Sequence, residues 1–154
     1  MPAAYVFSRQ LSEELGGFVS FDQGWHSDDA TWALFGAQNG IKPIKDAFIR
    51  WRLSNISITP AMLHDHFRST QAELAFLSWV DANSARLGLT DSDIRELTDD
   101  SICWSIYHGI AQISERSWLP TAWRTARLLR RYSSKSLLGH LFRFARARVT
   151  RLSM

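Results

Sequence analysis

The 154 residues predict an α+β protein that is mostly helical, with a few short strands before residue 58 and a bundle of amphipathic helices after it. Three observations lead to this prediction. Short apolar runs and glycine-rich loops fill the first third of the chain, and apolar residues recur at helical spacing in the rest. The apolar fraction of 45% and the charged fraction of 21% are typical of a folded globular protein.

The first third is expected to combine strands with helices. A short apolar run over residues 5–7 predicts the end of a strand, and a helix is expected over residues 9–15, with a glycine ending it. A second helix should begin at residue 27 or 28 and end at residue 39. Residues 47–52 contain apolar side chains without a helical stripe, which predicts a second strand.

The remainder is expected to be helical throughout. The predicted helices cover residues 60–83, 91–97, 102–113, a stretch beginning at Pro120, and 136–152. Thr90 is placed to cap the second of them. The sequence contains no internal repeat and no low-complexity linker.

The two closing helices each have an apolar side. Its members are Leu119, Ala122, Trp123, Ala126 and Leu129 in the first helix, and Leu138, Leu141, Phe142, Ala145, Val149 and Leu152 in the second. Because side chains three and four residues apart lie on one helical face, each set forms one apolar side of its helix, which suits either packing on the domain or contact with a membrane surface.

The cellular compartment follows from the lone cysteine and from the absence of long apolar stretches. Cys103 excludes an internal disulfide, and its apolar neighbours predict that the thiol is buried. The amino terminus lacks the pattern of a leader peptide, and no apolar stretch is long enough to span a membrane. We expect a cytoplasmic protein, with attachment to the inner face of the membrane as an alternative.

Charge divides the chain unevenly. Residues 116–154 contain ten basic residues and no acidic one, whereas residues 1–115 contain eight basic and fifteen acidic residues, a balance of −7. Three interpretations of the basic segment stay open: a helical hairpin with a solvated arginine face, a surface that binds an anionic membrane, and a surface that binds nucleic acid. We rank the first two equally and nucleic acid third.

Residues 16–32 combine paired glycines, aromatic side chains and the adjacent acidic residues Asp28 and Asp29. Carboxylates at a helix start are favoured by the backbone N–H groups and the helix dipole, so one interpretation is a capped helix. The other is that one of the two is a general base in a cleft. His26 is placed to touch a substrate or to tune an aspartate.

Four segments resemble, in order and spacing, the second half of family 2 glycosyltransferases. They are Tyr-Val-Phe-Ser-Arg (5–9), Leu-Gly-Gly-Phe (15–18), Trp-His-Ser-Asp-Asp-Ala-Thr-Trp (25–32) and Trp-Arg-Leu-Ser-Asn-Ile-Ser (51–57). The resemblance implies the carboxy-terminal part of a GT-A-type α/β domain over 1–58, followed by a helical extension over 59–115 and a basic helical tail over 116–154.

The resemblance also implies an activity: inverting transfer of a sugar from a nucleotide-sugar donor to a glycan or lipid-linked acceptor. Asp29 matches the family's general base, and Asp28 would be its companion. Residues proposed to bind substrate are Trp25, His26, Trp32, Arg52 and Asn55. The two tryptophans can equally belong to the core, and the arginine can equally be a solvated loop residue.

This sequence departs from the family at the donor site. Members hold a divalent metal, Mg²⁺ or Mn²⁺, with an Asp-x-Asp that precedes the Gly-Gly-Phe turn, and no aspartate precedes Gly16 here. We therefore expect a metal only in a complete enzyme, with an amino-terminal half supplied from elsewhere. The alternative function is a non-enzymatic helical module that binds nucleic acid, membrane or a protein partner. A metal site at residues 64–66 is disfavoured, because helical residues two apart point in different directions.

Overall fold

The computed structural model describes residues 5–22, 24–50 and 65–152. Within these ranges the chain forms eight α-helices and one π-helical turn, and no strand. They are α1 (Arg9–Glu14), α2 (Ser27–Asn39), α4 (His66–Ala82), α5 (Ser84–Leu87), α6 (Asp91–Leu97), η2 (Thr98–Ile102), α7 (Cys103–Ala111), α8 (Glu115–Tyr132) and α9 (Leu137–Leu152). The predicted α+β class, and with it the portion of a GT-A-type α/β domain, is wrong for the described residues.

The strand predictions failed because apolar runs also suit an extended chain that packs aromatic rings. Tyr5 and Phe7 belong to no strand, and their rings contact Trp32 at centroid distances of 4.3 and 5.6 Å. Residues 47–50 have no regular structure. A strand persists only where a neighbour satisfies its backbone N–H and C=O groups, and the described ranges offer no such neighbour. Residues 51–64 lie outside the described residues.

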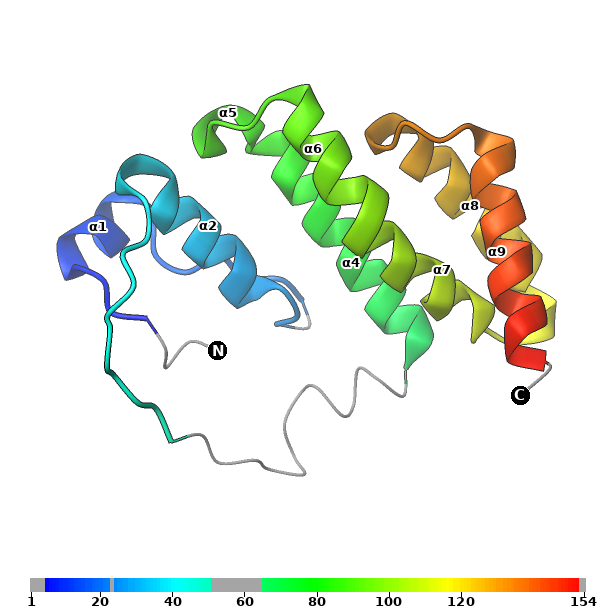
Figure 1. Ribbon diagram of the computed structural model, residues 1–154, viewed down its shortest axis with the longest axis horizontal. Coiled ribbons are helices and arrows are strands. Elements are labelled where there is room, and N and C mark those ends of the chain that lie inside the picture. Colours follow the sequence, from blue (N-terminus) through cyan, green and yellow to red (C-terminus); the bar gives the residue numbers. More distant parts are fainter. Residues whose placement is uncertain (1–4, 23, 51–64, 153–154) are drawn as a thin grey trace.

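Helices α1 and α2 form one end of the molecule, and α8 and α9 form the other, with α4, α6 and α7 between them (Figure 1). Ser8 caps α1 by accepting the backbone N–H of Leu11, as the sequence predicts, and Gly16 follows with φ +85°. The buried side chains of α2 are packed by α1 and by Trp79 of α4.

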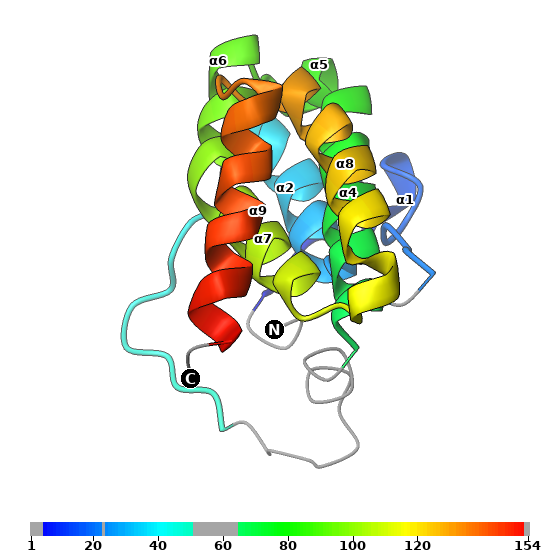
Figure 2. The same ribbon diagram turned by 90° about the vertical axis from the view of Figure 1, so that its right-hand side faces the viewer.

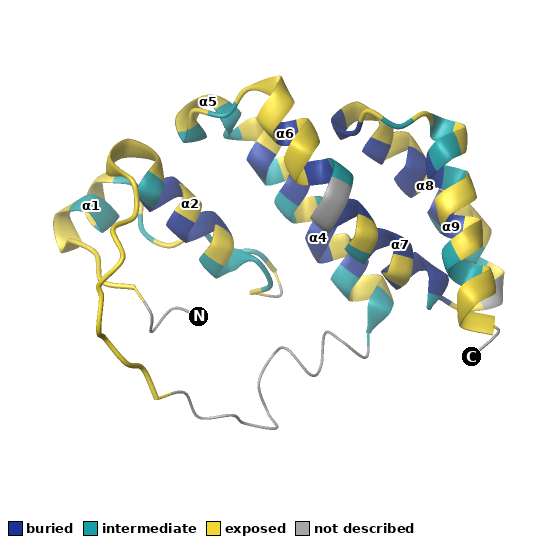
Figure 3. Cartoon of the chain, in the orientation of Figure 1, coloured by how far each residue is buried: buried dark blue, intermediate teal, exposed yellow. Residues whose placement is uncertain are grey.

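The core lies between α4, α7, α8 and α9 (Figure 3). Thr90 and Asp93 form a reciprocal capping box at the start of α6, and the π-helical turn then continues the chain into α7 without a break. Gly109 of α7 lies so close to α4 that a Cβ there would overlap Thr70 Oγ1. None of the helices in the described residues is both long and apolar enough to cross a bilayer.

Helix α8 begins five residues before the predicted start, so Pro120 lies inside it. Proline has no backbone N–H, so the carbonyl oxygen of Arg116, four residues earlier in the helix, receives no hydrogen bond from position 120. The turn into α9 is tied to η2 by Asp99, which accepts hydrogen bonds from the Ser133 and Ser134 hydroxyls and pairs with Lys135. Although partial burial acts in the opposite direction, these donors lower the pKa of Asp99 to about 2.

The bounds predicted for α9 agree with the structure to within one residue, but the apolar side identified in the sequence is not the side that packs on the core. Most of this apolar side, namely Leu138, Phe142, Ala145, Val149 and Leu152, is exposed, and Leu141 alone is half-buried. The face on the core instead carries Phe144 and His140, both fully buried, with the His140 Nδ1 atom 2.6 Å from the Tyr107 hydroxyl. Because His140 is polar but lies on the packing face, the apolar residues of the sequence pattern are centred on a different side of the helix.

Candidate active site at the start of helix α2

The loop before α2 is folded back on the first turns of that helix. The backbone N–H of Phe21 donates to the Ser27 hydroxyl at 3.1 Å, and the N–H of Val19 donates to the Thr31 hydroxyl at 3.0 Å. His26 precedes the helix with a left-handed backbone, φ 62°. For a residue other than glycine this conformation is held in place by surrounding contacts.

The acidic pair lies in the first turn of α2, where the helix dipole favours negative charge. Asp28 Oδ1 accepts the backbone N–H of Asp29 at 3.1 Å. Asp29 is different: its Oδ2 is 2.8 Å from Nδ1 of His26, while its side chain stays 60% exposed. The capping interpretation therefore describes Asp28, and Asp29 presents a positioned carboxylate to solvent.

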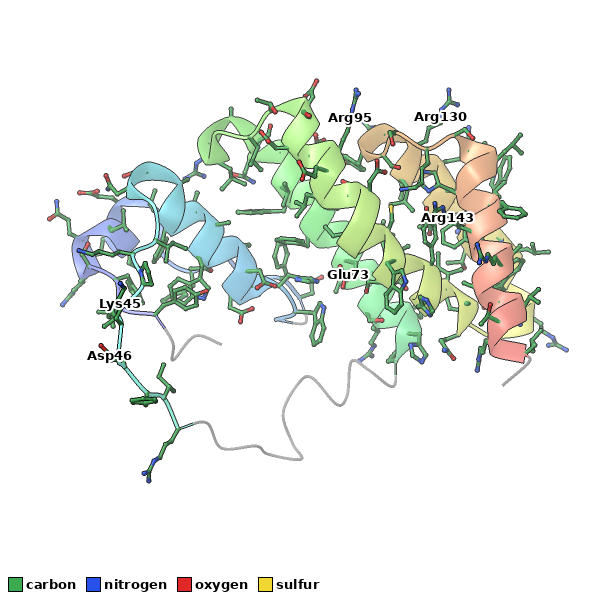
Figure 4. The ribbon with its side chains drawn as sticks, viewed as in Figure 1. Lys45, Asp46, Glu73, Arg95, Arg130 and Arg143 are labelled. Carbon is green, nitrogen blue, oxygen red and sulfur yellow. The ribbon has the colours of Figure 1, made fainter. Side chains whose placement is uncertain are left out.

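A chain of polar contacts continues from His26 into the helical core. His26 Nε2 is 3.2 Å from Oε1 of Glu73 on α4, the residue labelled in Figure 4. This contact is an ion pair without hydrogen-bond alignment, because Nε2 has no hydrogen-bond partner. Glu73 is buried and also accepts a hydrogen bond from the Ser105 hydroxyl at 3.1 Å. Four side chains thus link the start of α2 to the middle of α4 and the first turn of α7.

Aromatic rings surround the imidazole of His26. Phe76 stacks on it with centroids 4.6 Å apart and planes 18° from parallel, and Trp25 contacts its edge at 5.8 Å. Phe21 packs edge-on against Phe76 at 6.5 Å. The indole Nε1 of Trp25 is buried without a hydrogen-bond partner. These rings hold the imidazole in place by packing against its face and its edge.

The charge of His26 follows from its two carboxylate neighbours. Burial alone would lower its pKa, but Glu73 and Asp29 together raise the pKa above the usual value of 6.5. The imidazolium therefore holds Asp29 most firmly below pH 6.5, and this contribution is lost as the pH rises through the elevated pKa.

We expect the His26 imidazole to titrate with a midpoint above 6.5 and the variant Glu73→Gln to lower that midpoint, because glutamine keeps the shape but removes the charge. The midpoints of the wild type and of Glu73→Gln are measured from the histidine NMR signals between pH 5 and pH 9. This range includes the usual histidine pKa of about 6.5. Glu96→Gln, on the exposed side of α6, is the control and should leave the midpoint in place. An unchanged midpoint in Glu73→Gln would remove Glu73 from this site.

A cavity of about 360 Å³ lies next to the site, between the loop and α4. It is lined by Ser20, Phe21, Asp22, Gln71, Ala72 and Ala75. Asp29 and His26 do not line it, but Phe21 forms part of its wall and contacts the ring that stacks on His26. A ligand in this cavity would touch the aromatic support of the acidic site.

The remaining predicted site residues have different positions. Trp32 is buried among the rings of Tyr5, Phe7, Phe18 and Phe35, and it therefore belongs to the core. Arg52 and Asn55 lie outside the described residues. Sequence reasoning missed Glu73 and Phe76. The signal for Glu73 was a carboxylate flanked by apolar residues within the longest predicted helix.

The described residues provide no fitting site for the Mg²⁺ or Mn²⁺ ion expected of a complete enzyme. No group of three His, Cys, Asp or Glu side chains in these ranges is placed to hold a metal. Asp65 caps α4 by accepting the backbone N–H of Arg68, and Asp93 belongs to the capping box of α6.

Comparison of the chain with protein-family models, with curated proteins and with solved structures finds no match. The resemblance to family 2 glycosyltransferases therefore depends on the four sequence segments.

Proposed function

We propose that the start of α2 supplies the acceptor side of an inverting sugar transfer, with Asp29 as the general base. In such a reaction the acceptor hydroxyl oxygen attacks the anomeric carbon, its proton passes to a carboxylate, and the nucleoside diphosphate leaves. The base must be deprotonated, accessible and held in position. The side chain of Asp29 is 60% exposed and one of its oxygens is fixed by His26.

The observation that carries the proposal is the chain of contacts from Asp29 through His26 to Glu73. A carboxylate that only caps a helix has no need of a buried ion pair on another helix behind it. Here Glu73, 11% exposed as a side chain, and the stacked ring of Phe76 hold the imidazole that orients Asp29. A general base is commonly oriented in this way by a second residue that a third residue holds in place.

The aromatic neighbours suit a sugar as the ligand. Trp25 is half-buried beside His26 and can present part of its ring face to a sugar. The proposal does not depend on a sheet. The donor and its metal would be bound by a segment outside these 154 residues, and no step written here uses the metal.

Saccharide binding tests the proposal on the chain as it is. We expect common mono- and oligosaccharides at roughly millimolar concentration, the weak end of ligand affinities, to shift the NMR signals of Trp25 and His26, and Asp29→Asn to weaken this binding. Asp81→Asn, an exposed aspartate near the end of α4, is the matched control and should bind as the wild type does. An acceptor site at α2 would be contradicted if saccharides caused no shift of these signals. It would also be contradicted if Asp29→Asn bound the saccharides as the wild type does.

A further inference from the structure

Helix α9 carries a second apolar face that points away from the core. Leu138, Phe142, Ala145, Val149 and Leu152, here called the outer stripe, follow the spacing of one helical face. Leu138 and Phe142 are 77% and 70% exposed. At 100° per residue the outer stripe is centred about 120° from Phe144, the centre of the buried face. Large apolar side chains exposed in a continuous row mark an interaction surface.

The helix packed beside α9 also exposes apolar side chains. On α8, Leu119 is 65% and Trp123 is 47% exposed, so both helices of the hairpin display apolar side chains to solvent. Tryptophan at the edge of an apolar surface is typical of interfaces between apolar and aqueous phases. Figure 2 shows α8 and α9 in front, with α1 and α2 behind them. The hairpin can therefore meet a flat surface without obstruction by the amino-terminal helices.

Strong positive charge accompanies the apolar side chains. Apart from Arg151, the exposed arginines of the hairpin are Arg116, Arg124, Arg127, Arg130, Arg131, Arg143 and Arg146, and no acidic residue follows Glu115 in the sequence. Figure 4 labels Arg130 and Arg143.

Two further arginines have a structural role instead. Arg148 donates to the carbonyl oxygens of Ala111 and Ile113 at 3.1 and 2.8 Å, and Arg151 donates to that of Ala111 at 3.1 Å. They cap the end of α7. The charge available to a partner is therefore that of the exposed arginines.

We propose that the outer stripe and the exposed arginines of the α8–α9 hairpin dock this protein on the surface of an anionic membrane. Charge complementarity selects this occupant. A second copy would bring arginine against arginine, and Glu115 at the start of α8 is the one acidic residue in the sequence of the hairpin. Nucleic acid would use the arginines and leave the outer stripe in water. An anionic lipid surface accepts apolar side chains below its headgroups and arginines among its phosphates.

This inference is independent of the proposed sugar transfer, because none of its residues belongs to the site at α2. Flotation with vesicles tests it. Vesicles of phosphatidylcholine containing about 30% phosphatidylglycerol should bind the wild-type chain, and pure phosphatidylcholine vesicles should bind it at least about tenfold less. The double variant Leu138→Ser, Phe142→Ser should lose at least about tenfold in binding to the anionic vesicles.

Two further variants sharpen the test. Arg127→Gln and Arg131→Gln should each weaken anionic binding by about fivefold, with a loss that grows smaller at high salt. Phe48→Ser, at a side chain that is 95% exposed on the segment after α2, is the matched control and should bind as the wild type does. Far-UV circular dichroism confirms that each variant is folded, which is expected because all replaced side chains are exposed.

Several results would overturn the membrane proposal. One is wild-type binding by the Leu138→Ser, Phe142→Ser variant, and another is equal binding to neutral and anionic vesicles. If the wild-type chain does not bind vesicles but is a dimer by light scattering, and the double variant is a monomer, the outer stripe binds a second copy. If the chain does not bind vesicles, and the wild type and the double variant bind oligonucleotides with equal affinity, the arginines bind nucleic acid.

Discussion

Replacing Asp29 with asparagine is expected to lower the rate of sugar transfer by about 10²–10⁴-fold, the usual contribution of a general base. Asparagine preserves the size of the side chain but cannot accept the hydroxyl proton. The contact with His26 would weaken because the charge is lost, yet the fold should persist, since the side chain is 60% exposed. Acceptor affinity should change far less than the rate, because the proton moves only in the transition state.

The measurement is product formation from a nucleotide sugar by this chain joined to a segment that binds the donor. Asp28→Asn should have a smaller effect, since Asp28 accepts a backbone N–H inside the helix start. Asp81→Asn is the control for removing a surface carboxylate. An Asp29→Asn variant that transfers sugar at the wild-type rate would exclude Asp29 as the base. If the saccharides still bound at α2, the chain would be a binding module.

Local features of the fold were predictable because short-range chemistry decides them. The Thr90 cap and the bounds of α6 follow from side chains that bond to backbone groups a few residues away. The strands were not predictable in the same way. An apolar run such as residues 5–7 can pair with another strand or pack its side chains on a helix. Which of the two occurs depends on the elements formed by the rest of the chain.

In the candidate site, too, contacts between residues close in sequence were predictable and contacts between distant residues were not. Asp29 and His26 are three residues apart, so their contact at 2.8 Å follows from the helix start itself. Glu73 and Phe76 reach the site from another helix, across a distance in sequence that no spacing pattern encodes. A buried glutamate inside an apolar helix face signals that a partner exists, because an unpaired charge there would be costly. It does not signal which residue the partner is.

Polar residues on a packing face mislead pattern reading, and α9 shows how. His140 and Arg148 count as polar, so the apolar stripe shifts away from them. In the structure His140 is buried against the Tyr107 hydroxyl and Arg148 caps α7 while its guanidinium lies 5.4 Å from the ring of Trp118. His140 Nδ1 and the Arg148 guanidinium each have a partner on another helix, whereas His140 Nε2 is buried without a hydrogen-bond partner. The apolar side identified in the sequence contains Phe142, whereas the core contains Phe144.

Phe144→Ala is therefore expected to cost about 3–5 kcal/mol of folding free energy, the range for deleting a buried aromatic ring. The side chain is fully buried, and its ring packs edge-on against Tyr107 at 4.8 Å. Because a domain of this size is stable by about 5–15 kcal/mol, the loss would show as a large fall in the denaturant midpoint.

Phe142→Ala offers a matched control, since it makes the same substitution two residues away on the same helix. Phe142 is 70% exposed, so its replacement should change the folding free energy by no more than about 0.5 kcal/mol. Urea unfolding followed by tryptophan fluorescence measures both variants. Equal costs would mean that the outer stripe is buried in the folded protein, and would contradict both this packing and the proposed membrane surface. A large cost for Phe144 alone would establish that α9 turns its outer stripe to solvent.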